Sequence, residues 1–145
     1  MRLLSRGAGA LLGLAVLATP VLAAESLTVR LSPGPRLVGT RADRSGVGKV
    51  TATLDGGKLT ISGTYEGLLG TPTGAHLFAG SAPGVRGPKV ADLTVSPATS
   101  GNVSGSATLN SKQRAAFAKG GVYVEIDSAD APDGDLWGWL WAPAE

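Results

Sequence analysis

Hydrophobic and polar residues alternate with a period of two along most of the chain from Leu27 onward. The alternation is clear in residues 27–31, 49–54 and 59–65, where apolar side chains occupy every second position. Strict alternation places the apolar side chains on one face of a strand, which is typical of a sheet with one buried face. Because glycine adopts the positive φ of a tight turn, Asp55-Gly56-Gly57 predicts a β-hairpin between the last two segments.

The pattern continues with further short segments and one interruption. Asn110 as N-cap, Gln113 completing a capping box and Gly120 as a stop predict a helix over residues 110–119. The other strands are expected near residues 73–79, 89–95, 102–109, 121–127 and 135–141. The 22 Gly and 9 Pro residues of the chain lie mainly between strands, as turn formers do. We therefore predict an all-β fold, an antiparallel β-sandwich of about eight strands with Greek-key-like connections.

The N-terminal residues have the features of a secretory signal peptide. Arg2 and Arg6 supply a positive start, an apolar run follows over residues 8–22, and Val21-Leu22-Ala23 has the small-residue pattern of a cleavage site. A retained membrane anchor is the alternative, but the apolar run is shorter than the ~20 residues that span a bilayer. We expect the signal to be removed.

Cleavage leaves residues 24–145 as one domain, secreted or periplasmic, with no membrane span. The chain has 13 Lys+Arg and 11 Asp+Glu, so loss of Arg2 and Arg6 with residues 1–23 makes the two counts equal. The basic excess that would favour nucleic-acid binding is thereby lost. The chain has no cysteine, and its stability must come from packing without disulfides.

The three tryptophans of the chain lie at alternate positions of the last predicted strand. Trp137, Trp139 and Trp141 therefore share one face of that strand. In the preceding segment the aliphatic residues form an inward set, which leaves Tyr123 and Glu125 on the outward face. If the two strands pair, these five residues form an aromatic and acidic surface that can stack on sugar rings and accept hydrogen bonds from hydroxyls.

Two interpretations of this aromatic surface stay open at this stage. It could contact a glycan, a cell-envelope component or an extracellular protein. It could instead be covered, either by the Gly- and Pro-rich loop of residues 32–48 or by a dimer interface, because exposed apolar surfaces of this size are commonly covered. The oligomeric state is left open.

Candidate catalytic and metal-binding residues are few. His76 is the only histidine, so a metal site made from His76 and Asp127, with or without Glu125, would have no second imidazole and no thiol. We expect no metal and no cofactor, and keep His76 with Asp127 as the weak alternative. The sequence has neither a nucleophile elbow nor a phosphate-binding glycine loop, so we expect a protein that is not an enzyme.

Three segments, residues 73–88, 121–127 and 132–140, resemble in this order the CHRD domain, a family named for chordin. The similarity covers most of residues 27–141. It implies an exported β-domain; the animal namesake binds secreted growth factors, and microbial members have no assigned role. The family's histidines would form an arrangement similar to the copper site of Cu/Zn superoxide dismutases.

The departures from the family pattern concern those histidines. His76 fills the first histidine position, whereas Phe78 and Asp127 stand where the family has histidines. We therefore predict an exported, non-catalytic CHRD-like binding module with an aromatic strip. A metal-binding CHRD protein with a degenerate copper or zinc site, and a purely structural exported domain, are the alternatives.

Overall fold

The computed structural model describes residues 9, 13–18, 24–34 and 44–142. Most of the predicted signal peptide, residues 1–23, including its predicted cleavage site, and most of the predicted loop of residues 32–48 therefore lie outside the described residues. Residues 13–18 have no regular secondary structure and are exposed. Within the described part of the chain, no helix is long and apolar enough to cross a bilayer.

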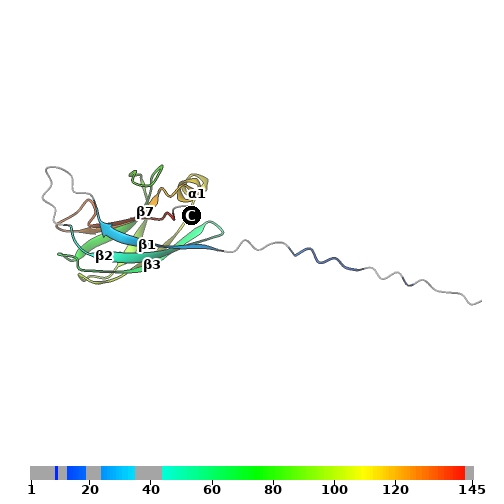
Figure 1. Cartoon of the computed structure of the whole chain (residues 1–145), viewed down its shortest axis with the longest axis horizontal. Coiled ribbons are helices and arrows are strands. Elements are labelled where there is room, and N and C mark those ends of the chain that lie inside the picture. Colours follow the sequence, from blue (N-terminus) through cyan, green and yellow to red (C-terminus); the bar gives the residue numbers. More distant parts are fainter. Residues whose placement is uncertain (1–8, 10–12, 19–23, 35–43, 143–145) are drawn as a thin grey trace, which may run out of the picture.

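The described residues form eight strands and one short helix, as the sequence pattern predicts (Figure 1). The elements are β1 (Glu25–Pro33), β2 (Val47–Asp55), β3 (Lys58–Glu66), β4 (Pro72–Ala79), β5 (Lys89–Val95), β6 (Gly101–Thr108), α1 (Ser111–Ala118), β7 (Val122–Ser128) and β8 (Leu136–Trp139). The predicted capping box is present: Asn110 Oδ1 accepts from the Gln113 N–H, and Gln113 Oε1 accepts from the Asn110 N–H, both at 2.9 Å. Gly120, with a φ of 75°, ends the helix as expected.

The strands close into a barrel, so the predicted open β-sandwich is wrong in architecture although right in strand number and pairing sense. Closure occurs because β1 bends from one neighbour to another: Glu25 to Leu31 pair with β2, and Ser32 and Pro33 pair with β8. On the other side, β5 pairs with both β4 and β6. The alternation of side chains is the same in a sandwich and a barrel, and it therefore could not reveal this closure.

The strand order around the barrel is β1-β2-β3-β6-β5-β4-β7-β8. The predicted Greek-key connections are present, because β7 returns through α1 to lie beside β4 after the β4, β5 and β6 meander. Figure 1 shows α1 beside β7, on the side of the barrel opposite β2 and β3. This crossover places α1 next to the chain segment that joins β4 to β5.

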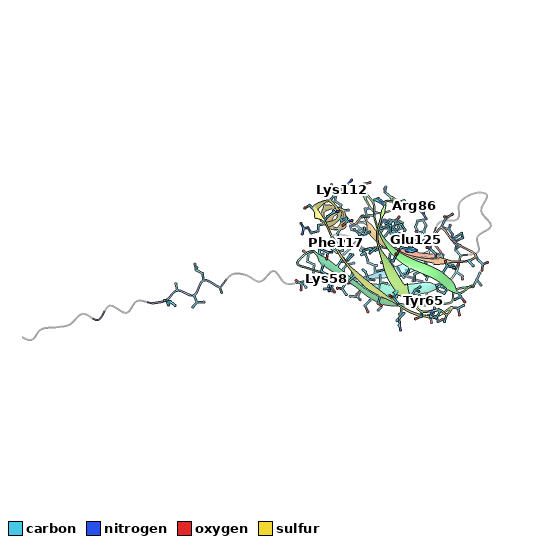
Figure 2. The ribbon with its side chains drawn as sticks, turned by 180° about the vertical axis from the view of Figure 1, so that it is seen from behind. Lys58, Tyr65, Arg86, Lys112, Phe117 and Glu125 are labelled. Atoms are coloured by element: carbon cyan, nitrogen blue, oxygen red, sulfur yellow. The ribbon has the colours of Figure 1, made fainter. Side chains whose placement is uncertain are left out.

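One continuous apolar core fills the barrel. Aliphatic side chains from all eight strands are buried in it. Phe117 of α1, labelled in Figure 2, and Leu109 are buried members of the same core. Leu136 and Leu140 are among the fully buried members, as the predicted inward phase of the last strand requires. Each such side chain contributes about 1.5–3 kcal/mol through burial. The inward phase leaves the aromatic and acidic residues of β7 and β8 on the outside of the barrel.

Candidate binding site on the outer face of β4, β7 and β8

Aromatic side chains form a row across three neighbouring strands on the outside of the barrel. Strand pairing places Phe78 of β4 opposite Tyr123 of β7, and Tyr123 opposite Trp139 of β8. The Tyr123 ring stacks on Phe78 with 5.1 Å between centroids and on Trp139 with 4.7 Å. Trp137 completes the group, 5.6 Å from Trp139. Each aromatic pair adds about 0.5–1.5 kcal/mol beyond the burial of its area.

The next row across the same strands carries the polar groups. His76 of β4 lies opposite Glu125 of β7, and Glu125 lies opposite Trp137 of β8. Asp127 follows two residues later on the same face of β7. We call the whole set the outer-face cluster; it consists of His76, Phe78, Tyr123, Glu125, Asp127, Trp137 and Trp139.

Most of the outer-face cluster is covered, which favours the second of the two interpretations left open by the sequence. Tyr123 is only 1% exposed and Trp137 only 8%. Trp139 is partly exposed, and Trp141, 50% exposed, lies beyond the end of β8 against Gly120. The structure thus brings Tyr123, Trp137 and Trp139 together and leaves Trp141 outside their stack.

Loop residues from distant parts of the sequence cover Trp137. The Arg86 guanidinium lies 4.3 Å from the centre of the Trp137 ring and the Arg44 guanidinium 5.8 Å. Gly34 and Gly134 also lie so close that a Cβ on either would collide with the indole. Within the loop of residues 32–48, Gly34 is the last described residue before residues 35–43 and Arg44 is the first described residue after them. Described residues from both parts of this loop therefore cover Trp137.

Glu125 lies buried at the centre of the cluster. Its carboxylate is 5% exposed, and Oε2 lies 3.4 Å from Nη2 of Arg86, whose side chain is 52% exposed. Burial and the neighbouring Asp127 carboxyl raise the pKa of Glu125 from its ordinary value of 4.5 to about 8, against a smaller opposing effect of Arg86. The folded protein therefore holds the proton of Glu125 to a higher pH than the unfolded chain does.

Asp127 and His76 form the polar edge of the cluster. Asp127 Oδ2 lies 3.1 Å from His76 Nε2, and Asp92 Oδ1 lies 2.9 Å from His76 Nδ1. Burial raises the pKa of Asp127, although hydrogen bonding with Glu125 and the His76 ring oppose the increase. Both ring nitrogens of His76 thus face carboxyl groups.

Three buried polar atoms of the cluster have no hydrogen-bond partner among the described residues. They are Nε1 of Trp137, Nε1 of Trp139 and Oδ1 of Asp127. Leaving such an atom unpaired costs about 1–3 kcal/mol, and folded proteins seldom tolerate it without a reason. The two indole N–H groups are donors and the Asp127 oxygen is an acceptor, and all three atoms are buried beneath the surface of the cluster.

A metal site from His76 and Asp127 is not favoured by this geometry. The structure brings the two residues together, but as a hydrogen-bonded pair in which the second ring nitrogen is held by Asp92. Among the described residues, no group of three or more His, Cys, Asp or Glu side chains is arranged to hold a metal ion. The ligand set also contains one nitrogen and no sulfur, which would discriminate poorly among metals.

Sequence analysis missed Arg86 and Asp92. Asp92 lies on β5, at the same register as His76 on β4, and only the strand pairing reveals that contact. Arg86 lies in the Gly- and Pro-rich connection after β4, where its one signal in the sequence is that it is the single charged residue of that connection. Asp135 links two loops to the end of β7: its carboxylate accepts a hydrogen bond from the Ser45 N–H at 2.9 Å and one from the Ser128 hydroxyl at 2.8 Å.

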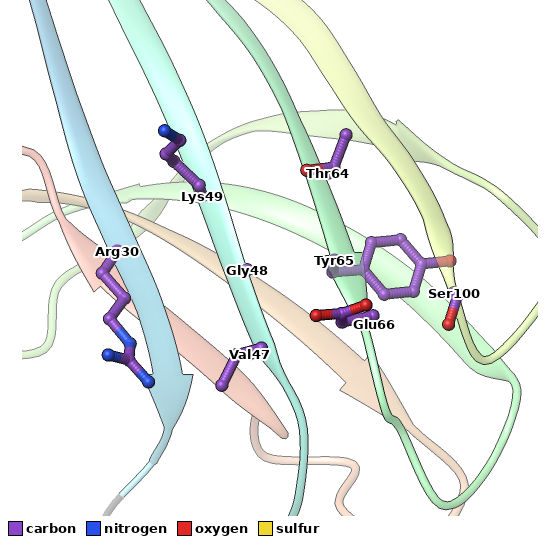
Figure 3. Close-up of a pocket in the computed structure, with 8 residues that line it drawn as sticks. All are labelled: Arg30, Val47, Gly48, Lys49, Thr64, Tyr65, Glu66 and Ser100. Carbon is purple, nitrogen blue, oxygen red and sulfur yellow. The ribbon is translucent and has the colours of Figure 1, made fainter.

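A separate concave surface shares no lining residue with the outer-face cluster (Figure 3). This open depression crosses β1, β2 and β3 and has a volume of about 530 Å³. Its walls carry Arg30 and Lys49 together with Glu66. The Tyr65 hydroxyl beside it is engaged, since it donates to carbonyl oxygens of the segment between β5 and β6. Nothing in this depression singles out a ligand chemistry.

Comparison with curated proteins and with solved structures finds no match to this chain. The comparison with protein families finds one, the CHRD domain, which matches residues 27–140. The match extends from β1 to the residue after β8 and so includes the whole barrel and the outer-face cluster. The chain therefore belongs to the CHRD domain family.

Proposed function

We propose that this protein is an exported, non-catalytic binding module that recognises a glycan through the outer-face cluster. The observation that carries the proposal is the pair of unpartnered indole N–H groups, on Trp137 and Trp139, beside a stack of aromatic rings. Aromatic faces stack on sugar rings, while indole donors and carboxyl groups bind hydroxyls. A non-polar ligand would leave these donors unpaired.

The accessible part of the cluster is smaller than a flat aromatic strip. Phe78 and Trp139 are partly exposed at the edge of the aromatic row, and Arg86 is exposed over its other side. A sugar ring can contact Trp139 without any rearrangement, and reaching the indole of Trp137 requires Arg86 to move. Since Arg86 lies in an exposed connection between strands, we assign it the role of a movable cover.

The test is gel retardation of the mature protein by neutral polysaccharides and by cell-envelope polysaccharide fractions, followed by titration of chitohexaose. Trp139→Ala should abolish retardation, whereas Leu69→Ala should leave it unchanged, because Leu69 is an exposed apolar residue in the connection between β3 and β4 and is not a member of the cluster. Unfolding of both variants in urea shows whether Trp139→Ala still folds.

Two results would overturn the proposal. One is the absence of retardation by every polysaccharide tested. The other is a Trp139→Ala protein that is less stable but is retarded like the wild type, which would identify the cluster as structural packing of an exported domain.

A further inference from the structure

A groove with a volume of about 550 Å³ lies between α1 and the connection of residues 80–88. None of the lining residues belongs to the outer-face cluster, although one of them, Arg86, also contacts Trp137 and Glu125 of that cluster. No acidic side chain lines the groove, whereas three cationic ones do: Arg86, Lys112 and Lys119. This composition is unusual in a chain that has nearly as many acids as bases.

One stripe of α1 forms the floor of the groove. Lys112, Ala115, Ala116 and the C-cap residue Lys119 all line it. Their spacing of three, four and seven residues puts them on one side of a helix. With a rise of 1.5 Å per residue, the two lysines stand about 10 Å apart along the axis, with small alanine side chains between them. Neither lysine has a salt bridge to another described residue.

The capping box determines which polar atoms the groove offers. Asn110 and Gln113 both line the groove, and both use their side-chain oxygens to accept backbone N–H groups of the first helical turn. The NH2 groups of the two side-chain amides remain as hydrogen-bond donors. The side chains of the groove thus present mainly amide, guanidinium and ammonium donors, with the Ser81 hydroxyl able to donate or accept.

We propose that the groove binds an acidic polysaccharide chain. Acidic groups of such a chain can bind Lys112 and Lys119 at the two ends of the floor, and its other oxygens can accept from Asn110 and Gln113. Apolar faces of sugar rings fit the alanines of the floor and the glycines of the facing connection, Gly80 and Gly87. A single-stranded nucleic acid would fit less well, because no aromatic side chain lines the groove and bases would have nothing to stack on.

This second site is independent of the proposed function, because it uses Lys112 and Lys119 rather than Trp139. The probe is hexagalacturonate, titrated calorimetrically against wild-type mature protein at low and at physiological salt. Binding should weaken about tenfold in Lys112→Gln/Lys119→Gln, through the loss of two charge-assisted contacts. The control Lys49→Gln/Lys58→Gln removes the same charge from exposed positions on β2 and β3 and should change binding less than twofold.

The outcomes separate the two sites. Trp139→Ala should keep its affinity for hexagalacturonate, and the lysine double variant should keep the retardation by neutral polysaccharides. Three results would overturn the groove proposal: no binding of hexagalacturonate, equal weakening in the control double variant, or tighter binding of a thymidine hexanucleotide. Thermal unfolding of both double variants verifies that they fold.

Discussion

The Arg86 guanidinium lies on the ring of Trp137 and, through Nη2, 3.4 Å from Oε2 of Glu125. Nη2 also donates to the carbonyl oxygen of Asp133. One side chain therefore covers the buried carboxyl group and the aromatic stack at once. Arg86 is itself half exposed, so its side chain lies between solvent on one side and the buried Glu125 and Trp137 on the other. The electrostatics of the cluster depend on that contact.

We expect Glu125→Gln to stabilise the protein above neutral pH. A raised pKa means that the folded state holds a proton that the unfolded state releases, so the stability contributed by Glu125 is complete below about pH 4.5 and is lost as the pH rises through about 8. Glutamine keeps the shape and cannot ionise. Since one pKa unit corresponds to about 1.4 kcal/mol, we expect a gain of about 1–3 kcal/mol at pH 9 and little change at pH 5.

Urea unfolding of Glu125→Gln and wild type at pH 5, 7 and 9 checks this prediction. The matched control is Glu66→Gln, at an exposed position on β3, which should move stability by less than about 0.5 kcal/mol at every pH. Parallel stability curves for Glu125→Gln and wild type across this range would contradict the raised pKa.

Arg86→Gln should have the opposite pH dependence. Removing the cation leaves ionised Glu125 without its partner, so the loss of stability should be larger at pH 9 than at pH 5. Because Arg86 is half exposed and screened by solvent, we expect the difference between the two pH values to be about 1 kcal/mol. The measurement is urea unfolding with Arg30→Gln, on β1, as control. An equal loss at both pH values would assign Arg86 to packing on Trp137 alone.

The sequence pattern was sufficient for the strands and for the phase of their side chains. Leu136 is in the core and Trp137 outside it, as strict alternation requires. The same pattern could not predict what covers the outer side. Barrel closure depends on two residues, Ser32 and Pro33, that pair with β8 after the rest of β1 has paired with β2.

The composition of the site was only partly predictable, for a related reason. Aromatic and acidic residues on one strand face are visible in the sequence, whereas the cover over Trp137 comes from Gly34, Arg44, Arg86 and Gly134, which are far apart along the chain. Their contacts depend on loop geometry, which no periodicity encodes. Burial of Trp137 and the raised pKa of Glu125 both follow from that cover.

Gly134→Ala should disrupt the cover over Trp137. Gly134 has a φ of 108°, and a Cβ there would lie 1.8 Å from Nε1 of Trp137, so backbone strain and a direct clash add together. We expect a loss of about 2–4 kcal/mol in the free energy of unfolding.

Gly84→Ala is the matched control, because its φ is 81° but a Cβ there meets nothing within 4 Å. It should cost only about 1 kcal/mol. Similar losses in the two variants would show that the clash with Trp137 is relieved elsewhere.

The three tryptophans should differ sharply in solvent access. Trp137 is buried under the arginine and glycine cover, whereas Trp141 is half exposed against Gly120. In a Trp139→Phe/Trp141→Phe protein, the remaining indole should emit at short wavelength and resist acrylamide. In a Trp137→Phe/Trp139→Phe protein, emission should lie at longer wavelength and be quenched several-fold more efficiently.

Adding Arg86→Gln to the Trp139→Phe/Trp141→Phe protein should raise the acrylamide quenching of Trp137, since the guanidinium shields that ring. Quenching that is unchanged by the loss of Arg86 would mean that the glycine-lined loops alone seal Trp137, and that moving Arg86 would not admit a sugar ring.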